Sequence, residues 1–133
     1  MIRAVADTHA LIWYLFDNKR LSRNAKEFIE NATNDGEKIG FSAISLIEIV
    51  YLIEKEKIDP STFERLMNAA ETSDVALVEL PVTSQIARKM REISREAIPD
   101  MPDRIIAATA LEQNAPIISR DGKIRVSGLE TIW

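Results

Sequence analysis

The chain has no cysteine and a single histidine, His9, among its 133 residues. The lack of cysteine excludes disulfides and thiolate metal sites, and one histidine excludes histidine-rich zinc sites. It also leaves little room for a Ser-His-Asp triad. No apolar run approaches the length that spans a membrane, and the first residues lack the layout of a signal peptide. These absences predict a cytoplasmic protein that makes no use of a membrane.

The composition is that of an ordinary globular protein, with 46% hydrophobic and 29% charged residues. The length suits one domain with a substantial core, and there is no repeat, low-complexity tract or linker. We therefore expect a single domain over residues 1–133. The net charge of -4 disfavours broad electrostatic wrapping of nucleic acid. Two divalent cations bound by acidic residues would bring this charge to zero, so a nucleic-acid substrate is not excluded.

Short apolar segments alternate with helical patterns along the chain. Strands are predicted at residues 2–6, 39–42, 75–80 and 116–119, and the segment 129–133 is compatible with a fifth. Helices are predicted at residues 8–16, 22–33, 42–56, 83–96 and 99–114. Another helix is predicted to start at Asp59-Pro60, with the proline early in its first turn. The alternation predicts an α/β fold with a central, mainly parallel sheet of four to five strands, covered by helices on both faces. In such sheets ligands bind at the carboxyl ends of the strands.

Four acidic residues lie where the chain changes direction: Asp7, Glu48, Asp103 and Asp121. Asp7 and Asp121 follow predicted strands, Asp103 lies in the first turn of a predicted helix, and Glu48 lies two turns into another. Acids so far apart in the sequence meet only in the fold. If they meet, their mutual repulsion is large unless a cation lies between them. The four acids therefore predict a metal site in one crevice.

Three of these acids also have structural explanations. Asp7 suits the N-cap of the helix that follows it, although Thr8 would fill that role equally well. Asp100 as an N-cap with Asp103 three residues later resembles a capping box. Asp121 precedes a glycine, which is a common turn signal. Each explanation is compatible with a second role at the crevice.

Glu48 is harder to explain structurally, because it interrupts the most apolar stretch of the chain, residues 46–53. A helix that is apolar nearly all round is expected to be buried on most faces, and an ionised carboxylate there needs a partner. Ser45 lies one turn earlier on the same face, but a hydroxyl does not neutralise a charge. The alternative to metal ligation is a buried ion pair with a distant Arg or Lys, and metal ligation is favoured.

With these acids placed, the chain resembles the PIN-domain family, in particular the VapC-like toxin ribonucleases of type II toxin–antitoxin systems. The segments that carry the resemblance are DTHALIW at 7–13, SLIEI at 45–49, PDMPDRIIAATAL at 99–111 and ISRDGKI at 118–124. The resemblance covers essentially the whole chain. Its most specific part is DRIIAATAL, and the order of this segment after DTHALIW adds weight.

The resemblance implies a PIN-like three-layer α/β/α fold and an enzyme that cuts RNA with Mg²⁺ or Mn²⁺. It matches the family's acidic metal-binding quartet, and hence the catalytic residues, to Asp7, Glu48, Asp103 and Asp121. Supporting roles are expected for Thr8, His9, Ser45, Asp100 and Ser119. His9 is expected to form local hydrogen bonds rather than to bind metal. Ser119 stands where many members carry threonine, a change that retains the hydroxyl.

The resemblance also implies three partners. RNA is the substrate of the family, and its toxin members are commonly dimers held inactive by a cognate antitoxin. We therefore expect an RNA substrate, an antitoxin protein and a second copy of this chain. Exposed apolar residues such as Tyr51 and Trp133 are candidates for the dimer surface.

The expected chemistry is metal-assisted phosphodiester hydrolysis, in which the cation lowers the pKa of a water molecule and no side chain needs to be a general base. Two alternatives stay open. One is a non-catalytic PIN-like module that binds RNA or a protein through the same crevice. The other is a phosphatase with Asp7 as nucleophile. His9 stands where phosphatases of the haloacid dehalogenase type need a second aspartate, which counts against that alternative.

Overall fold

The computed structural model describes residues 1–72 and 76–133, and its architecture confirms the predicted α/β class. The sheet contains β1 (Ile2–Ala6), β2 (Lys38–Ser42), β3 (Leu77–Leu80), β4 (Ile117–Ile118) and β5 (Thr131–Ile132). The strand order is β3-β2-β1-β4-β5, and every neighbouring pair is parallel. The carboxyl ends of the strands therefore lie along one edge, with β1 at the centre.

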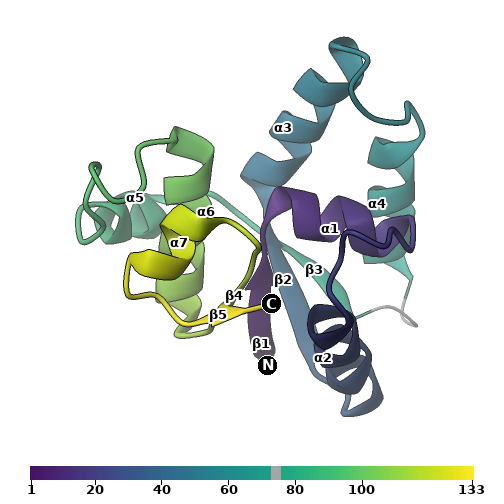
Figure 1. Ribbon diagram of the computed structural model, residues 1–133, viewed down its shortest axis with the longest axis horizontal. Helices are drawn as coiled ribbons and strands as arrows, with labels where there is room; N and C mark the ends of the chain where they lie inside the picture. Colours follow the sequence, from purple (N-terminus) through teal and green to yellow (C-terminus); the bar gives the residue numbers. More distant parts are fainter. Residues whose placement is uncertain (73–75) are drawn as a thin grey trace.

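Helices cover both faces of the sheet, as predicted. They are α1 (Thr8–Leu15), α2 (Arg23–Asn34), α3 (Ala43–Glu54), α4 (Thr62–Glu71), α5 (Ser84–Met90), α6 (Met101–Gln113) and α7 (Gly122–Val126). Figure 1 shows the sheet nearly edge-on, with α1, α2 and α4 on one side and α5, α6 and α7 on the other. Helices α1 and α3 begin where β1 and β2 end, so α3 projects past the carboxyl edge of the sheet.

Each face of the sheet has its own apolar core. On the side of α1, α2 and α4, the fully buried side chains include Leu11, Ile29 and Leu66. On the side of α5, α6 and α7 they include Ile106 and Ile124. Burial of this much apolar surface on both faces is what makes an all-parallel sheet stable. The short strands β4 and β5 thus gain most of their support from packing.

The helix predicted over residues 83–96 is too long, because α5 ends at Met90. The hydroxyl of Ser94 accepts the backbone N–H groups of the second and third residues after it, at 3.2 and 3.3 Å. This local pattern competes with helix formation. Arg104 of α6 donates to the carbonyl oxygens of Met90 and Ile93 at 2.8 and 3.0 Å, which satisfies groups that a continuing helix would have used.

The start of another predicted helix also shifts. Helix α4 begins at Thr62 rather than with Pro60 in its first turn, because Asp59 closes a turn by accepting the backbone N–H of Ser61 at 2.8 Å. Strand β3 was predicted from Val75, a position that lies outside the described residues. Helix α7 was not predicted at all. In the described part of the chain, no helix is long and apolar enough to cross a membrane.

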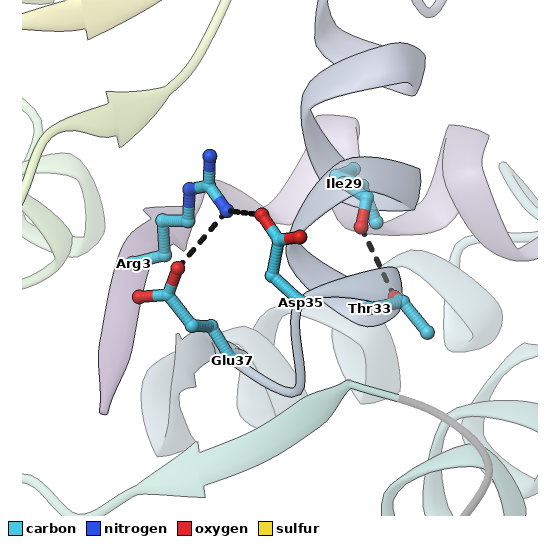
Figure 2. Close-up of polar contacts among 5 residues, drawn as sticks. All are labelled: Arg3, Ile29, Thr33, Asp35 and Glu37. Atoms are coloured by element: carbon cyan, nitrogen blue, oxygen red, sulfur yellow. Dashed lines mark hydrogen bonds and ion pairs between the residues drawn. The ribbon is translucent and has the colours of Figure 1, made fainter.

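The amino-terminal end of the sheet is tied by ion pairs that lie away from the acids of interest. Arg3 of β1 donates to Asp35 at 2.7 Å and to Glu37 at 3.0 Å, both in the turn that leads into β2 (Figure 2). In the same region the hydroxyl of Thr33 donates to the carbonyl oxygen of Ile29. These partly exposed pairs are screened by water and contribute little stability. Their acids therefore serve as controls for the acids at the other end.

Candidate active site

A pocket of about 370 Å³ opens at the carboxyl edge of the sheet. The residues that line it are Asp7, Thr8, His9, Trp13, Glu48, Asp100, Asp103, Arg120 and Asp121. The fold thus brings together all four acids that the sequence singled out, together with Asp100. Five carboxylates in one pocket make a strongly anionic site.

Asp7 lies at the end of β1, and its side chain is the N-cap of α1. Its Oδ1 accepts the backbone N–H of Ala10 at 2.8 Å, so Asp7 rather than Thr8 caps the helix. The residue is 9% exposed. Burial raises the pKa of Asp7, while hydrogen bonds from the Ser119 hydroxyl and from Ala10 oppose the rise. Ser119 is fully buried and also accepts the backbone N–H of Asp121 at 3.0 Å, so it links two of the acids.

A chain of hydroxyl groups holds Glu48 at the pocket. The Thr8 hydroxyl donates to Oε1 of Glu48 at 2.5 Å, and it lies 2.8 Å from the hydroxyl of Ser45. Because Thr8 has one hydroxyl proton and gives it to Glu48, Ser45 must donate to Thr8. Both hydroxyl residues are buried. Burial raises the pKa of Glu48, and the hydrogen bond from Thr8 opposes that rise.

The expectation that the helix carrying Glu48 is buried on most faces is wrong. Ile47, Val50 and Tyr51 of α3 are 53%, 41% and 60% exposed, because the helix projects past the sheet and other elements leave part of its surface uncovered. The alternative of a buried ion pair is not observed either. Over residues 1–72 and 76–133, no salt bridge involves Glu48.

The carboxyl group of Asp103 has a strongly raised pKa. The residue lies in the first turn of α6, where its backbone N–H donates to the N-cap Asp100 at 3.1 Å, as the capping pattern predicted. Burial and the negative charges of Asp100, Asp121, Glu48 and Asp7, in that order, raise the pKa of Asp103 to about 7. Without a cation, this carboxyl group therefore holds a proton close to neutral pH.

Asp121 is the N-cap of α7. From the sequence, Asp121 and the following glycine indicated only a turn. The Oδ1 of Asp121 accepts the backbone N–H of Lys123 at 2.8 Å. The charge of Asp121 reaches the other acids, since it contributes to the raised pKa values of Asp7 and Asp103. All four predicted acids therefore interact electrostatically in one pocket.

Two residues of the pocket were missed by sequence reasoning, Trp13 and Arg120. The guanidinium carbon of Arg120 lies 4.8 Å from the centroid of the Trp13 ring. The one available signal was the position of Arg120 beside Asp121 in a motif. His9 is exposed, and its ring lies 5.8 Å from the Trp13 ring. Among the described residues its side chain forms no hydrogen bond, so the local hydrogen-bonding role expected for His9 is not observed.

The donor set suits Mg²⁺ or Mn²⁺, because both ions prefer hard carboxylate oxygens. No three His, Asp or Glu side chains within the described ranges lie close enough to form a complete metal cluster. Mg²⁺ does not need one, since it keeps several waters and takes one or two carboxylates directly. The raised pKa values of Asp7, Glu48 and Asp103 also fit, because burial and, to a smaller extent, the neighbouring negative charges disfavour the ionised carboxylates, and a bound cation favours them.

Replacing Asp103 by asparagine is expected to stabilise the metal-free protein at neutral pH. The pKa of Asp103 is about 7 in the folded state, which exceeds the unfolded value. The free energy of unfolding of the metal-free protein therefore falls as the pH rises from about 4 through about 7. The carboxyl group is half-buried and solvent screens it, which leaves about 1 kcal/mol of relief. Asp103→Asn should therefore melt about 4 °C above wild type at about pH 8 in EDTA.

The same melts contain their own controls. The advantage should vanish near about pH 5, where Asp103 is protonated in wild type. Part of the gain is offset by losing a negative charge at the start of α6. Asp7→Asn is a second probe, because asparagine caps a helix as well as aspartate. Mg²⁺ should raise the wild-type melting temperature more than that of either variant. If all three proteins melt alike and none responds to Mg²⁺ or Mn²⁺, the acids do not act as one site.

Comparison with protein families matches residues 4–127 to the family described as PIN domain. Among curated proteins, the chain is similar to Ribonuclease VapC22 of Mycobacterium tuberculosis. The two are 26% identical over 130 residues, which cover 94% of this chain and 92% of the relative.

Solved structures share the fold at lower sequence identity. A chain in the crystal structure of VapBC2 from Rickettsia felis, bound to a DNA fragment from their promoter, superposes with a TM-score of 0.72 at 18% identity and covers 100% of both chains. A chain of a toxin–antitoxin complex from Klebsiella pneumoniae superposes with a TM-score of 0.68 at 23% identity and covers 98% of this chain and 96% of the other.

Proposed function

The chain belongs to the PIN-domain family, and from this membership we propose that it is a metal-dependent endoribonuclease acting as the toxin of a toxin–antitoxin pair. The observation that carries the proposal is the convergence of five carboxylates in one pocket at the carboxyl edge of the sheet. An RNA substrate is supported by the name of the curated relative, a ribonuclease. An antitoxin partner is supported by the toxin–antitoxin complexes that share the fold.

In this proposal Asp7, Glu48 and Asp103 hold Mg²⁺ or Mn²⁺ directly or through water, and Asp121 completes the quartet. When bound, such an ion lowers the pKa of a water molecule and neutralises charge on the phosphate that is attacked. Asp103 must lose its proton to act as a ligand, so cation binding is coupled to proton release.

The other residues of the pocket have supporting roles. The chain from Ser45 through Thr8 fixes the carboxylate of Glu48. The Ser119 hydroxyl, whose hydrogen bond helps to keep Asp7 ionised, also fixes the loop that carries Asp121. A fixed set of ligands lowers the reorganisation needed when substrate arrives, which is the main way such a site contributes to catalysis.

The direct experiment is RNA cleavage by purified protein that has been stripped with EDTA and then given millimolar Mn²⁺ or Mg²⁺. The substrate is a pool containing single-stranded and structured RNA. We expect cleavage only after the metal is restored. Cleavage that survives excess EDTA would falsify the metal mechanism. RNA that is bound but stays intact with Mn²⁺ would favour the non-catalytic binding module instead.

We also propose a homodimer, in which the exposed apolar side chains of α3 supply surface for association. Ile47, Val50 and Tyr51 form this patch on one helix. Of the two residues expected at the dimer surface, Tyr51 is exposed, whereas Trp133 packs against Trp13 with 5.9 Å between ring centroids. Sedimentation velocity of wild type and of Tyr51→Glu tests this assembly.

A further inference from the structure

Arg120 is the one lysine or arginine that lines the acidic pocket within the described residues. Five carboxylates line the same pocket, yet in residues 1–72 and 76–133 no salt bridge joins Arg120 to any of them. Its guanidinium group lies over the Trp13 ring instead, 4.8 Å from the centroid. The positive charge is therefore directed to the pocket without being neutralised by a neighbouring acid.

Neighbouring residues hold both the Trp13 ring and the backbone of Arg120 in place. Trp13 of α1 is only 8% exposed, and the rings of His9 and Trp133 lie tilted against it at 5.8 and 5.9 Å. The backbone of Arg120 lies between the buried Ser119 and the helix cap Asp121. The face of an aromatic ring attracts a guanidinium group and leaves the edge of the guanidinium, with its N–H donors, free. Arg120 itself is exposed.

We propose that Arg120, held on the Trp13 ring, binds a backbone phosphate of the RNA strand that enters the pocket. This inference rests on the proposed ribonuclease function and names a substrate contact that the acids alone do not supply. A phosphate that approaches five carboxylates meets repulsion, and Arg120 offers it a cation at the mouth of the pocket. Arginine suits the role because its planar fork donates two parallel hydrogen bonds to a phosphate while its face stacks on a ring.

The test compares Arg120→Gln and Arg120→Lys with wild type in cleavage of a short labelled RNA with Mn²⁺. Arg120→Gln should raise KM roughly tenfold with little change in kcat, because it removes a charged hydrogen bond made to bound RNA. The slope of log affinity against log salt should become smaller by about 0.7, the value for one phosphate contact on a single strand. Arg120→Lys keeps the charge, so it should keep the salt slope and show an intermediate KM.

Three further variants separate RNA binding from structure. Arg125→Gln is the matched control, because Arg125 is an exposed arginine of the adjacent α7 that does not line the pocket. It should leave KM and the salt slope unchanged. Trp13→Leu removes the ring beneath Arg120 and should raise KM several-fold, while Trp13→Phe, which keeps an aromatic face, should stay close to wild type. Melting temperatures of the Arg120 variants should equal that of wild type.

The outcomes distinguish this inference from the proposed function. If wild type cuts RNA and Arg120→Gln has the wild-type KM and salt slope, the role of Arg120 is wrong and the ribonuclease stands. If wild type cuts no RNA with Mn²⁺, the proposed function fails. In that case fluorescence anisotropy with the same RNA still decides the contact. Equal affinity of Arg120→Gln and wild type overturns it, and a weaker affinity with a smaller salt slope supports it.

Discussion

Cleavage of RNA by the Asp103→Asn variant is expected to be at least about 1000-fold slower than by wild type, a loss of about 4 kcal/mol of transition-state stabilisation. Asparagine retains the shape of the side chain and removes the charge that holds the cation. The same loss is expected for Asp7→Asn and for Glu48→Gln, because a bound divalent ion supplies several kcal/mol to the reaction. Initial rates with Mn²⁺ and saturating RNA measure the effect.

Asp121→Asn is expected to have a smaller effect, roughly 10- to 100-fold, because we expect Asp121 to act on the cation through the other ligands or water, and its cap on α7 survives in asparagine. The matched control is Asp35→Asn, at the opposite end of the sheet, where the carboxylate pairs with Arg3. It should cleave RNA like wild type. Full activity in Asp7→Asn would remove that residue from the site, and lost activity in Asp35→Asn would show that folding, not the pocket, is being measured.

Overproduction of the wild-type chain is expected to stop growth of its host, because uncontrolled RNA cleavage halts translation. Asp103→Asn produced at the same level should leave growth unaffected. Co-expression of the protein encoded beside it, if that protein is the antitoxin, should restore growth and co-purify with the chain. Growth curves and the yield of the complex are the measurements.

The control for this experiment is Arg125→Gln, which leaves the pocket intact and should arrest growth like wild type. Growth arrest by both wild type and Asp103→Asn would mean that toxicity is unrelated to the pocket. If an enzyme that cuts RNA in vitro leaves growth untouched in its own host, the chain is a housekeeping nuclease rather than a toxin.

Local chemistry explains why the α/β class and the acids were predictable. Asp100 and Asp103 are three residues apart, so the helix cap can be read directly from the sequence. Asp7 follows an apolar strand, and parallel strands place such residues at one edge. The convergence of these acids with Glu48 and Asp121 was then the simplest explanation of carboxylates in otherwise apolar surroundings.

Features that depend on contacts between distant segments were not predictable. The helix α5 ends early partly because Arg104, far along the chain, donates to the carbonyl oxygens of Met90, its last residue, and of Ile93 just beyond it. The place of Arg120 over Trp13 arises only when β4 lies beside β1. The exposed face of α3 was mistaken for a buried one, because an apolar pattern does not state which faces other elements cover.

The raised pKa of Asp103 also predicts how metal affinity depends on pH. A carboxylate must be deprotonated to bind a cation, so protons compete with the metal below about pH 7. The affinity for Mn²⁺ should therefore fall as pH decreases through that region. At high pH the ionised carboxylates of the pocket both destabilise the metal-free protein and favour cation binding.

The most direct test of the central claim, that the acids form one cation site, is calorimetric titration of Mn²⁺ into wild type and Asp103→Asn. For wild type we expect binding at about pH 7.5 that is weakened roughly tenfold or more at about pH 5.5, with protons released on binding. Asp103→Asn should bind Mn²⁺ far more weakly and with less dependence on pH. Wild type that binds no Mn²⁺ at about pH 7.5, or a variant that binds it as tightly as wild type, would contradict the account.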